Sequence, residues 1–169
     1  ILHLGKISLI DKKLFNDKII FTINSIEDID YINNICNKYS KKVRCHIKVD
    51  TGMNRMGCKE SDFIEILELS ITSKYIVLEG IYSHLSCADE KTSLSNKYQI
   101  SIVKKIMDLS KGFSLQYHLL NSAGLFNYTD SKYNIVRCGL SLYGVSPFSE
   151  INNNLFPVMT FKAPIILIK

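Results

Sequence analysis

The sequence predicts an α/β protein with a parallel sheet built from strand–helix units. Short runs rich in β-branched residues alternate along the chain with longer stretches whose apolar residues recur every three to four positions. Four of the strand-like runs also end in polar residues, and barrels and open α/β sheets build their sites at the carboxyl ends of parallel strands. The chain has 169 residues, 46% of them hydrophobic, which is enough for one domain with a substantial core.

Six segments have the pattern of strands. They are residues 1–4, 19–23, 43–49, 76–83, 115–120 and 134–137. A closed (β/α)8 barrel needs eight strand–helix units and typically ~250 residues. Six units therefore fit either an open doubly wound sheet or a TIM barrel that is incomplete, with two of its eight units missing. The pattern alone leaves both architectures open.

Helices are expected between these strands. Ser25 and Ser61 are placed to cap the first two, a third spans residues 94–110, and shorter helices follow Lys12 and Asn121. The side chains expected to face inward recur with the helical period. They are Ile26, Ile29, Ile32, Ile35, Cys36 and Tyr39 in the first helix, Phe63, Ile66 and Leu67 in the second, and Tyr98, Ile102, Ile106 and Leu109 in the third.

The end of the chain changes character. Residues 149–154 (SEINNN) are polar and have the composition of a linker. The segment that follows, FPVMTFKAPIILIK, has the composition of β structure interrupted by Pro164. We therefore expect an α/β domain over residues 1–148, and a linker with the first strands of a truncated C-terminal β domain over residues 149–169.

Composition and charge exclude several classes of function. The 21 basic and 16 acidic residues give a net charge of +5 without a run of five like charges, so no nucleic-acid-binding tail is expected. Five cysteines without a CxxC pair predict free thiols in a reducing compartment, with neither a metal site nor a disulfide framework. No apolar stretch reaches transmembrane length, and no signal peptide opens the chain. We therefore expect a cytoplasmic protein that binds neither membranes nor nucleic acids.

Charged side chains at the ends of the predicted strands are the strongest sign of a site. Lys48 lies between Ile47 and Val49 in a core strand, where an unpaired cation is costly. Arg137 closes the last strand and cannot lose its charge there. Asp50, in contrast, is also a common turn former before Thr51 and Gly52.

The remaining polar positions are individually ambiguous. His84 after the fourth strand has the alternative of a satisfied loop histidine, and Ser122 that of a helix N-cap. Gly139 has the alternative of merely relieving crowding. Taken together, Ser122 and Gly139 follow the last two strands, where many barrels bind phosphate on exposed backbone N–H groups. With Arg137 beside them they predict a phosphorylated ligand, and a nucleotide is disfavoured because no Walker or GxGxxG loop is present.

Four motifs carry a resemblance to a known family. HIKVDTGMNRMG, EGIYSHLSCADE, HLLNSAG and VRCGLSLYG occur in this order and resemble the alanine racemase family. That family uses pyridoxal 5′-phosphate (PLP) on a TIM barrel followed by a β domain, and residues 1–5 are similar to its third-strand segment. The resemblance implies that residues 1–148 form a partial PLP-binding barrel with about six of eight units.

The resemblance also implies roles for single residues. Lys48 matches the family lysine that is often carbamylated, and Arg55 the arginine that this lysine orients toward the cofactor's phenolic oxygen and the substrate carboxylate. His84 matches the histidine that supports the pyridine-facing arginine, which is Arg137. The matching phosphate cradle and the supporting positions are Ser122, Gly139, Leu140, Asn121 and Met53. No metal is implied.

Two physical arguments agree with these roles. PLP withdraws electrons best through a protonated ring nitrogen, usually paired with a carboxylate. An arginine such as Arg137 cannot accept a proton, so it weakens this effect and favours rapid reprotonation, as racemisation needs. Carbamylation would turn Lys48 into an anionic partner of Arg55, which explains why a lysine occupies the strand.

The family's two catalytic bases are not found in this sequence. The Schiff-base lysine belongs to a KADAYG-like segment on the first barrel strand, and the opposing tyrosine belongs to the C-terminal domain of a homodimer; neither has a match here. We therefore expect a fragment that is inactive alone, from a protein that converts L-alanine to D-alanine for peptidoglycan precursors. The alternatives are a racemase for serine or another amino acid, a catalytically silent PLP-binding module, and an unrelated phosphate-binding barrel enzyme.

Overall fold

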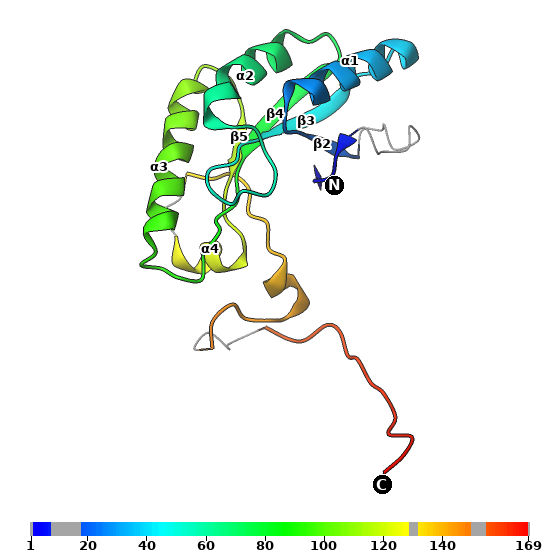
Figure 1. Cartoon of the computed structure of the whole chain (residues 1–169), viewed down its shortest axis with the longest axis vertical. Coiled ribbons are helices and arrows are strands. Elements are labelled where there is room, and N and C mark those ends of the chain that lie inside the picture. The colour runs from blue at the N-terminus through cyan, green and yellow to red at the C-terminus, as the bar shows by residue number, and fades with distance from the viewer. Residues whose placement is uncertain (1, 8–17, 129–131, 150–154, 169) are drawn as a thin grey trace.

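The computed structural model describes residues 2–7, 18–128, 132–149 and 155–168 (Figure 1). Its strands form one parallel sheet in the order β1-β2-β3-β4-β5. The strands are β1 (Leu2–His3), β2 (Ile20–Ile23), β3 (Val43–Lys48), β4 (Ile76–Tyr82) and β5 (Gln116–His118). The helices are α1 (Ile26–Tyr39), α2 (Phe63–Thr72), α3 (Leu94–Leu109) and α4 (Ser122–Asn127), with 3-10 turns η3 (Glu60–Asp62) and η4 (Leu140–Tyr143).

The order of the strands decides between the two predicted architectures. Every strand lies beside its neighbour in sequence, and every pair is parallel. A doubly wound sheet reverses its strand order at a switch point, whereas a (β/α)8 barrel keeps sequence order throughout. The described sheet is therefore part of a parallel barrel.

The sixth predicted strand does not form. Residues 134–137 run beside the continuation of β5, where Asn134 donates its N–H to the Tyr117 carbonyl at 2.9 Å. The N–H of Arg137 similarly reaches the Leu120 carbonyl at 2.9 Å, and Arg137 makes one isolated parallel bridge to Asn121. The segment occupies the position of a next strand, but among the described residues it forms an isolated bridge and not the ladder that defines a strand.

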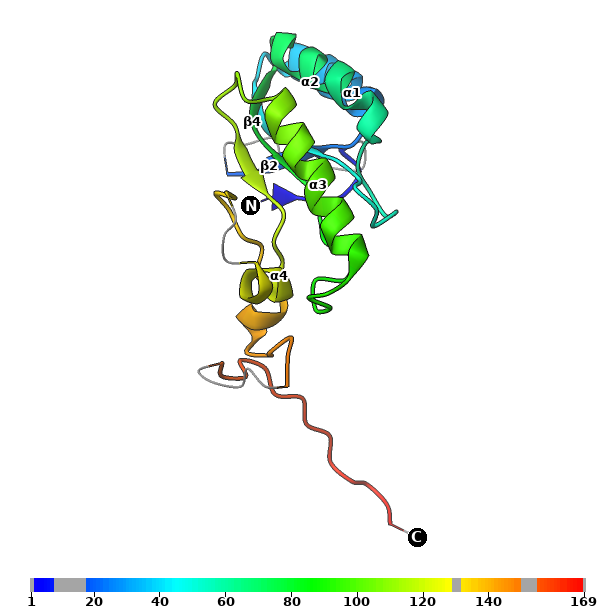
Figure 2. The same ribbon diagram turned by 90° about the vertical axis from the view of Figure 1, so that its left-hand side faces the viewer.

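Buried apolar side chains alternate with polar ones along the strands, so the two faces of the sheet differ. Alternate residues of β2 and β3 such as Phe21, Ile23, Cys45 and Ile47 are fully buried in one core with α1 and α2. Figures 1 and 2 show the helices along this side of the sheet. The opposite parity carries polar and aromatic side chains, among them His46 in β3. In a barrel that second face is the interior.

Three details of the predicted helices are wrong. Ser25 precedes α1 without making a side-chain cap, and the Asp28 carboxylate instead accepts the Asn24 N–H at 2.9 Å. Ser61 lies inside η3, so Asp62 and not Ser61 precedes α2. On the predicted inner faces Tyr39, Tyr98 and Leu109 are exposed. The buried face of α3 includes Asn96 and Gln99 instead, because these amides find partners in neighbouring loops. The short helix expected after Lys12 lies outside the described residues.

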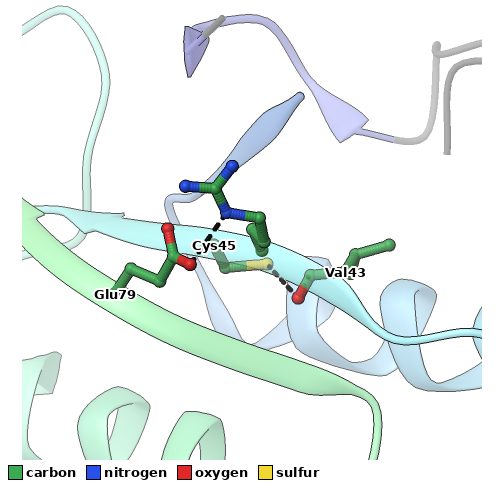
Figure 3. A network of polar contacts seen from close by, with 4 residues as sticks. Val43, Cys45 and Glu79 are labelled. Carbon is green, nitrogen blue, oxygen red and sulfur yellow. Dashed lines mark hydrogen bonds and ion pairs between the residues drawn. The ribbon is translucent and has the colours of Figure 1, made fainter. Parts of the chain in front are cut away.

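A register shift between β3 and β4 aligns the site. It falls between Cys45 and His46, and after it Lys48 lies opposite Tyr82. Close to the shift, Arg44 Nε and a Glu79 carboxylate oxygen form an ion pair at 2.8 Å, and the Cys45 thiol lies 3.9 Å from the Val43 carbonyl oxygen (Figure 3). Because the pair is partly exposed, it contributes at most about 1 kcal/mol.

The C-terminal segment 155–168 contains no strand or helix. It extends away from the barrel segment in both views (Figures 1 and 2), and its large apolar side chains from Phe156 to Ile168 are at least 67% exposed. A strand needs a ladder of backbone hydrogen bonds, and the backbone bond seen for this segment among the described residues is a single long one, from the Val158 N–H to the Tyr143 carbonyl at 3.4 Å. The C-terminal β domain therefore stays a prediction. Within the described ranges, no helix is long and apolar enough to cross a membrane.

Candidate active site

The loop after β3 folds back onto the strand that it leaves. The Asp50 carboxylate accepts the N–H groups of Gly52 at 2.9 Å and Asn54 at 3.0 Å. Cys58 then donates its N–H to the Lys48 carbonyl and accepts the Asp50 N–H, both at 2.9 Å. A side chain at Gly57 would lie 2.7 Å from the Asp50 nitrogen, and its φ of +119° disfavours any other residue. Asp50 is thus a turn former, and this turn carries Arg55 back toward Lys48.

Lys48 lies in a positively charged environment. Its side chain is 5% exposed, and burial lowers its pKa, with a further lowering by the charges of Arg55 and Arg137 that Asp50 offsets only in part. Its Nζ lies 5.9 Å from the centre of the Tyr82 ring, and the Arg137 guanidinium lies 5.0 Å from the same ring. Both cations therefore use the electron-rich face of one tyrosine.

Arg137 is fixed by neutral groups. Its Nη1 lies 2.6 Å from His118 Nδ1, and its Nη2 donates to the Ser83 carbonyl at 2.6 Å. The same Nη2 lies 3.1 Å from His84 Nδ1 and 3.4 Å from the Leu119 carbonyl oxygen. These contacts come from the ends of β4 and β5, so Arg137 joins the two strand ends and the segment that follows them.

The contacts of Arg137 set the tautomers of the neighbouring histidines. Arginine only donates, so His118 accepts at Nδ1 and carries its proton on Nε2. That Nε2 lies 2.8 Å from His46 Nδ1, which must accept in turn. Burial, followed by nearby positive charge, lowers the pKa of His84 to about 4, and burial likewise lowers the pKa of His46 to about 4. The pKa of His118 falls well below its usual range for the same reasons, so all three rings stay neutral beside a cation.

Ser122 and the segment after Arg137 meet in a second corner of the site. The Ser122 hydroxyl oxygen accepts the Ser141 N–H at 3.1 Å, which places it against the turn that begins with Gly139 and Leu140. A side chain added at Gly139 would meet nothing within 4 Å. The N-cap of α4 is Asn121 and not Ser122, because the Asn121 amide oxygen accepts the Gly124 N–H at 2.9 Å.

The structure brings most of the predicted site residues together. Lys48, Arg55 and His84 are electrostatically linked to one another. Arg137 contacts His84 directly and pairs with Asn121, the neighbour of Ser122. Met53 is half-buried in the turn after β3, and no hydrogen bond or ring contact ties it to the others, so its role stays a prediction.

Sequence reasoning missed Tyr82 and His118, which contact the cations of the site. His118 stacks on Tyr82 with ring centres 4.6 Å apart and 6° between the planes, and Tyr82 in turn hydrogen-bonds Thr22 at 2.8 Å. Lys48, Tyr82 and His118 occupy one row across three strands. His46 and Lys48 lie two residues apart in one strand, so the sequence indicates that they share a face of the sheet. The row could not be predicted, because it depends on the register shift between β3 and β4.

Positive charge predominates among the side chains of the site. Within the described residues the ion pairs are Arg44–Glu79 and Lys105–Glu60, so Lys48, Arg55 and Arg137 have no carboxylate partner there. The same residues contain no group of three or more His, Cys, Asp and Glu side chains able to hold a metal. A part-buried cluster of cations at the carboxyl edge of parallel strands is the arrangement of a barrel-type protein with a site suited to an anionic ligand.

Comparison with known proteins gives the family. The family model described as the N-terminal domain of alanine racemase matches residues 1–147. Alanine racemase of Francisella philomiragia is 35% identical over 138 residues, which cover 80% of this chain and 38% of that protein. The enzyme of Francisella tularensis subsp. mediasiatica is 36% identical over 138 residues, which again cover 80% of this chain and 38% of that protein. The chain belongs to the alanine racemase family, and it spans about 38% of the length of these curated relatives.

Solved structures agree with this assignment. Alanine racemase of Clostridium difficile superposes with a TM-score of 0.76 at 31% identity, covering 92% of this chain and 42% of that one. The Bartonella henselae enzyme, solved with covalently bound pyridoxal phosphate, gives a TM-score of 0.71 at 27% identity, covering 82% and 40%. The predicted family and the predicted barrel type are therefore confirmed.

Proposed function

We propose that this chain supplies the PLP-binding and substrate-carboxylate-binding part of a racemase that interconverts L- and D-alanine. The D-alanine would serve peptidoglycan precursors. The observation that carries the proposal is the cluster of Lys48, Arg55 and Arg137, which lacks a carboxylate partner among the described residues. Membership of the alanine racemase family indicates which anions such a cluster would hold, namely PLP and the carboxylate of the substrate. By itself, without the family's two bases, the chain is expected to be inactive.

The residues present fit PLP. The open space at Gly139, beside the Ser122 hydroxyl and the backbone of Leu140, suits a phosphate group. Within the described residues the Nε of Arg137 has no hydrogen-bond partner, which leaves one donor for the pyridine nitrogen. Arg55 is exposed at the turn, free to reach the phenolic oxygen and the substrate carboxylate. When bound, PLP supplies an electron-withdrawing ring that acidifies the α C–H of the amino acid.

Arg137 explains why racemisation is favoured over other PLP chemistry. It is a donor at every accessible pH, and its acceptors are neutral imidazoles and carbonyl groups. Arg137 would therefore donate a hydrogen bond to the pyridine nitrogen but keep its proton, so the nitrogen would stay unprotonated. With PLP bound, this arrangement would weaken electron withdrawal by the ring and would favour prompt return of a proton to the α carbon, as racemisation requires.

Lys48 is suited to carbamylation. Its lowered pKa raises the fraction of neutral amine. In carbamylation this amine attacks the carbon of CO2, an N–C bond forms, and the nitrogen releases one proton to leave a carbamate anion. That anion would pair with Arg55. A ¹³C NMR signal from labelled bicarbonate that is absent in Lys48→Arg would support this assignment, and an identical spectrum in the variant would refute it.

The proposal extends to the domain organisation and the assembly of the whole protein. Residues 1–148 would be about six of eight barrel units, and residues 149–169 would be the linker and first strands of the C-terminal β domain. The whole protein would be a cytoplasmic homodimer that acts on a small amino acid without nucleic acid or membrane.

Ligand binding to the chain itself tests the site. The probe is pyridoxine 5′-phosphate, which lacks the aldehyde and cannot react with surface lysines, and the measurement is isothermal titration calorimetry. Arg55→Met should weaken binding about tenfold, the value of one charge-assisted hydrogen bond. Lys104→Met removes the same charge from the exposed side of α3 and should change nothing. Equal losses in both variants, or no binding by the unmodified chain, would refute the site.

Substrate choice is tested in the complete racemase that carries this chain. Turnover of alanine, serine and lysine is compared with PLP present, and alanine should be turned over fastest. Arg137→Glu should abolish turnover, since a carboxylate accepts a hydrogen bond and would stabilise a protonated pyridine nitrogen in place of the unprotonated one that Arg137 favours. Full activity in this variant would show that the role given to Arg137 is wrong.

A further inference from the structure

Gln99 occupies a place that an apolar residue would ordinarily fill. It lies on the buried face of α3 with Ile102, Val103 and Ile106, and its side chain is fully buried. Burying an amide is costly unless its donors and acceptors are all paired. Its partners therefore indicate what the residue does.

Every hydrogen-bonding position of the Gln99 amide is used. Its nitrogen donates to the Thr51 hydroxyl oxygen at 3.1 Å and to the His84 carbonyl at 2.8 Å. Its oxygen accepts the N–H of Ser86 at 2.9 Å and the Ser86 hydroxyl at 3.1 Å. The two donors and two acceptors of the amide are thus satisfied by two different loops.

These two loops carry the site. Thr51 begins the turn that positions Arg55, and its hydroxyl is also bonded to the Ser83 hydroxyl at 2.7 Å. The Gln99 stem lies against Gly52, where an added Cβ would be 3.6 Å from the Gln99 Cγ. On the other side, Gln99 holds the backbone at His84, directly beside the groups that contact Arg137.

We propose that Gln99 is a positioning residue, which holds the loop carrying Arg55 and the loop carrying His84 in one fixed relation. The inference rests on the proposed function, because it assigns Gln99 to the site in which Arg55 and His84 act. Gln99 touches neither ligand nor cofactor in this role. It acts through the backbone of its neighbours.

Asn96 provides a matched control on the same helix. It is also fully buried, and its side-chain nitrogen donates to the Cys87 carbonyl at 2.7 Å and the Glu90 carbonyl at 2.9 Å. These bonds hold residues 87–90 and contact neither Thr51 nor His84. Replacing Asn96 therefore costs stability in the later part of this loop and leaves the Gln99 bonds to Thr51, His84 and Ser86 in place.

The test is NMR of the histidine rings in the cofactor-free 169-residue chain. In the unmodified chain the His84 ring should show no titration between pH 8 and pH 6, because burial and the charges of Arg137, Arg55 and Lys48 keep it neutral. In Gln99→Met, which keeps the length of the side chain, the midpoint should rise by at least about two units, from about 4 toward 6.5, and so enter this range. Asn96→Leu should leave the ring signal flat. A flat signal in Gln99→Met would overturn the proposal.

A second measurement needs no variant. The Ser86 amide donates to α3 through Gln99, so its hydrogen exchange in the unmodified chain should be as slow as that of helical amides such as Val103. Exchange at the rate of an open loop would overturn the proposal even if Gln99→Met failed to fold. Both readouts are made without cofactor, so a failure of pyridoxine phosphate binding would be seen separately.

Discussion

Acid should destabilise this chain well above the pH at which carboxylates titrate. His46 and His118 are almost fully buried, and His84 lies part-buried beside Arg137. Burial lowers the pKa of His46 and His84 to about 4, and that of His118 falls further. Folding lowers these values, so the unfolded chain binds more protons below pH 6.5 than the folded chain does. Stability is therefore complete above pH 6.5 and is lost as the pH falls toward 4.

The size of the effect follows from proton linkage. At pH 5.5 an unfolded histidine with a pKa of about 6.5 is stabilised by about 1.4 kcal/mol through protonation. A folded histidine with a pKa near 4 gains almost nothing at this pH. Three such residues give about 4 kcal/mol between pH 7.5 and pH 5.5, which is most of the stability of a marginal domain. Glu27, whose pKa the Ser25 hydroxyl lowers, titrates below this window.

Urea unfolding followed by circular dichroism at pH 7.5, 6.5 and 5.5 measures this loss. His118→Gln keeps an oxygen that can accept from Arg137 but removes one titrating group, so its pH dependence should be smaller by about a third. Measurements between pH 7.5 and 8.5 should show almost no change. Equal unfolding free energies at pH 7.5 and pH 5.5 would show that these histidines are charged in the folded state.

Three further predictions concern stability and association. Gly57→Ala should cost more than about 2 kcal/mol in urea unfolding, because φ is +119° and the new Cβ meets strand backbone; Gly112→Ala, which meets nothing, should be nearly neutral. Gly80→Ala should cost about 2 kcal/mol and shift the His46 ring resonances, since the Cβ would lie 3.0 Å from that ring; unchanged resonances would contradict the packing. The chain should associate through its exposed apolar segment 155–168, so removing that segment should lower the mass seen by light scattering, and an equally monomeric parent chain would contradict this.

Much of the fold could be predicted from the sequence because its signals are local. The five strands fall within the predicted segments, and α1 and α2 bury most of the expected residues. The strand at residues 134–137 could not be separated from an extended segment, since its status depends on how many backbone groups find a neighbour. The buried face of α3 was mispredicted around Tyr98 for a related reason: apolar periodicity cannot anticipate that loops will satisfy a buried amide.

The candidate site was predictable where charge breaks an apolar strand. Lys48 and Arg137 stood out because a cation in a core strand needs a reason, and the structure brings both to the Tyr82 ring. His118 carried no such signal, because a neutral histidine in a strand is compatible with ordinary packing. Its importance comes from the register that places it beside Tyr82 and from the direction of the Arg137 side chain. Neither of these is encoded locally.

The neutral surroundings of Arg137 connect the stability of the chain with its proposed chemistry. A carboxylate in place of His118 would hold the guanidinium more strongly, but it would also neutralise the charge that an anionic ligand requires. Imidazole and carbonyl acceptors fix the geometry and leave the charge in place. The cost is that the same imidazoles must stay unprotonated, so the feature that keeps Arg137 available for a ligand also makes the fold sensitive to acid. His118→Gln should therefore affect the two properties differently. The variant should lose less stability in acid, while its affinity for pyridoxine phosphate, which depends on Arg137, should stay unchanged.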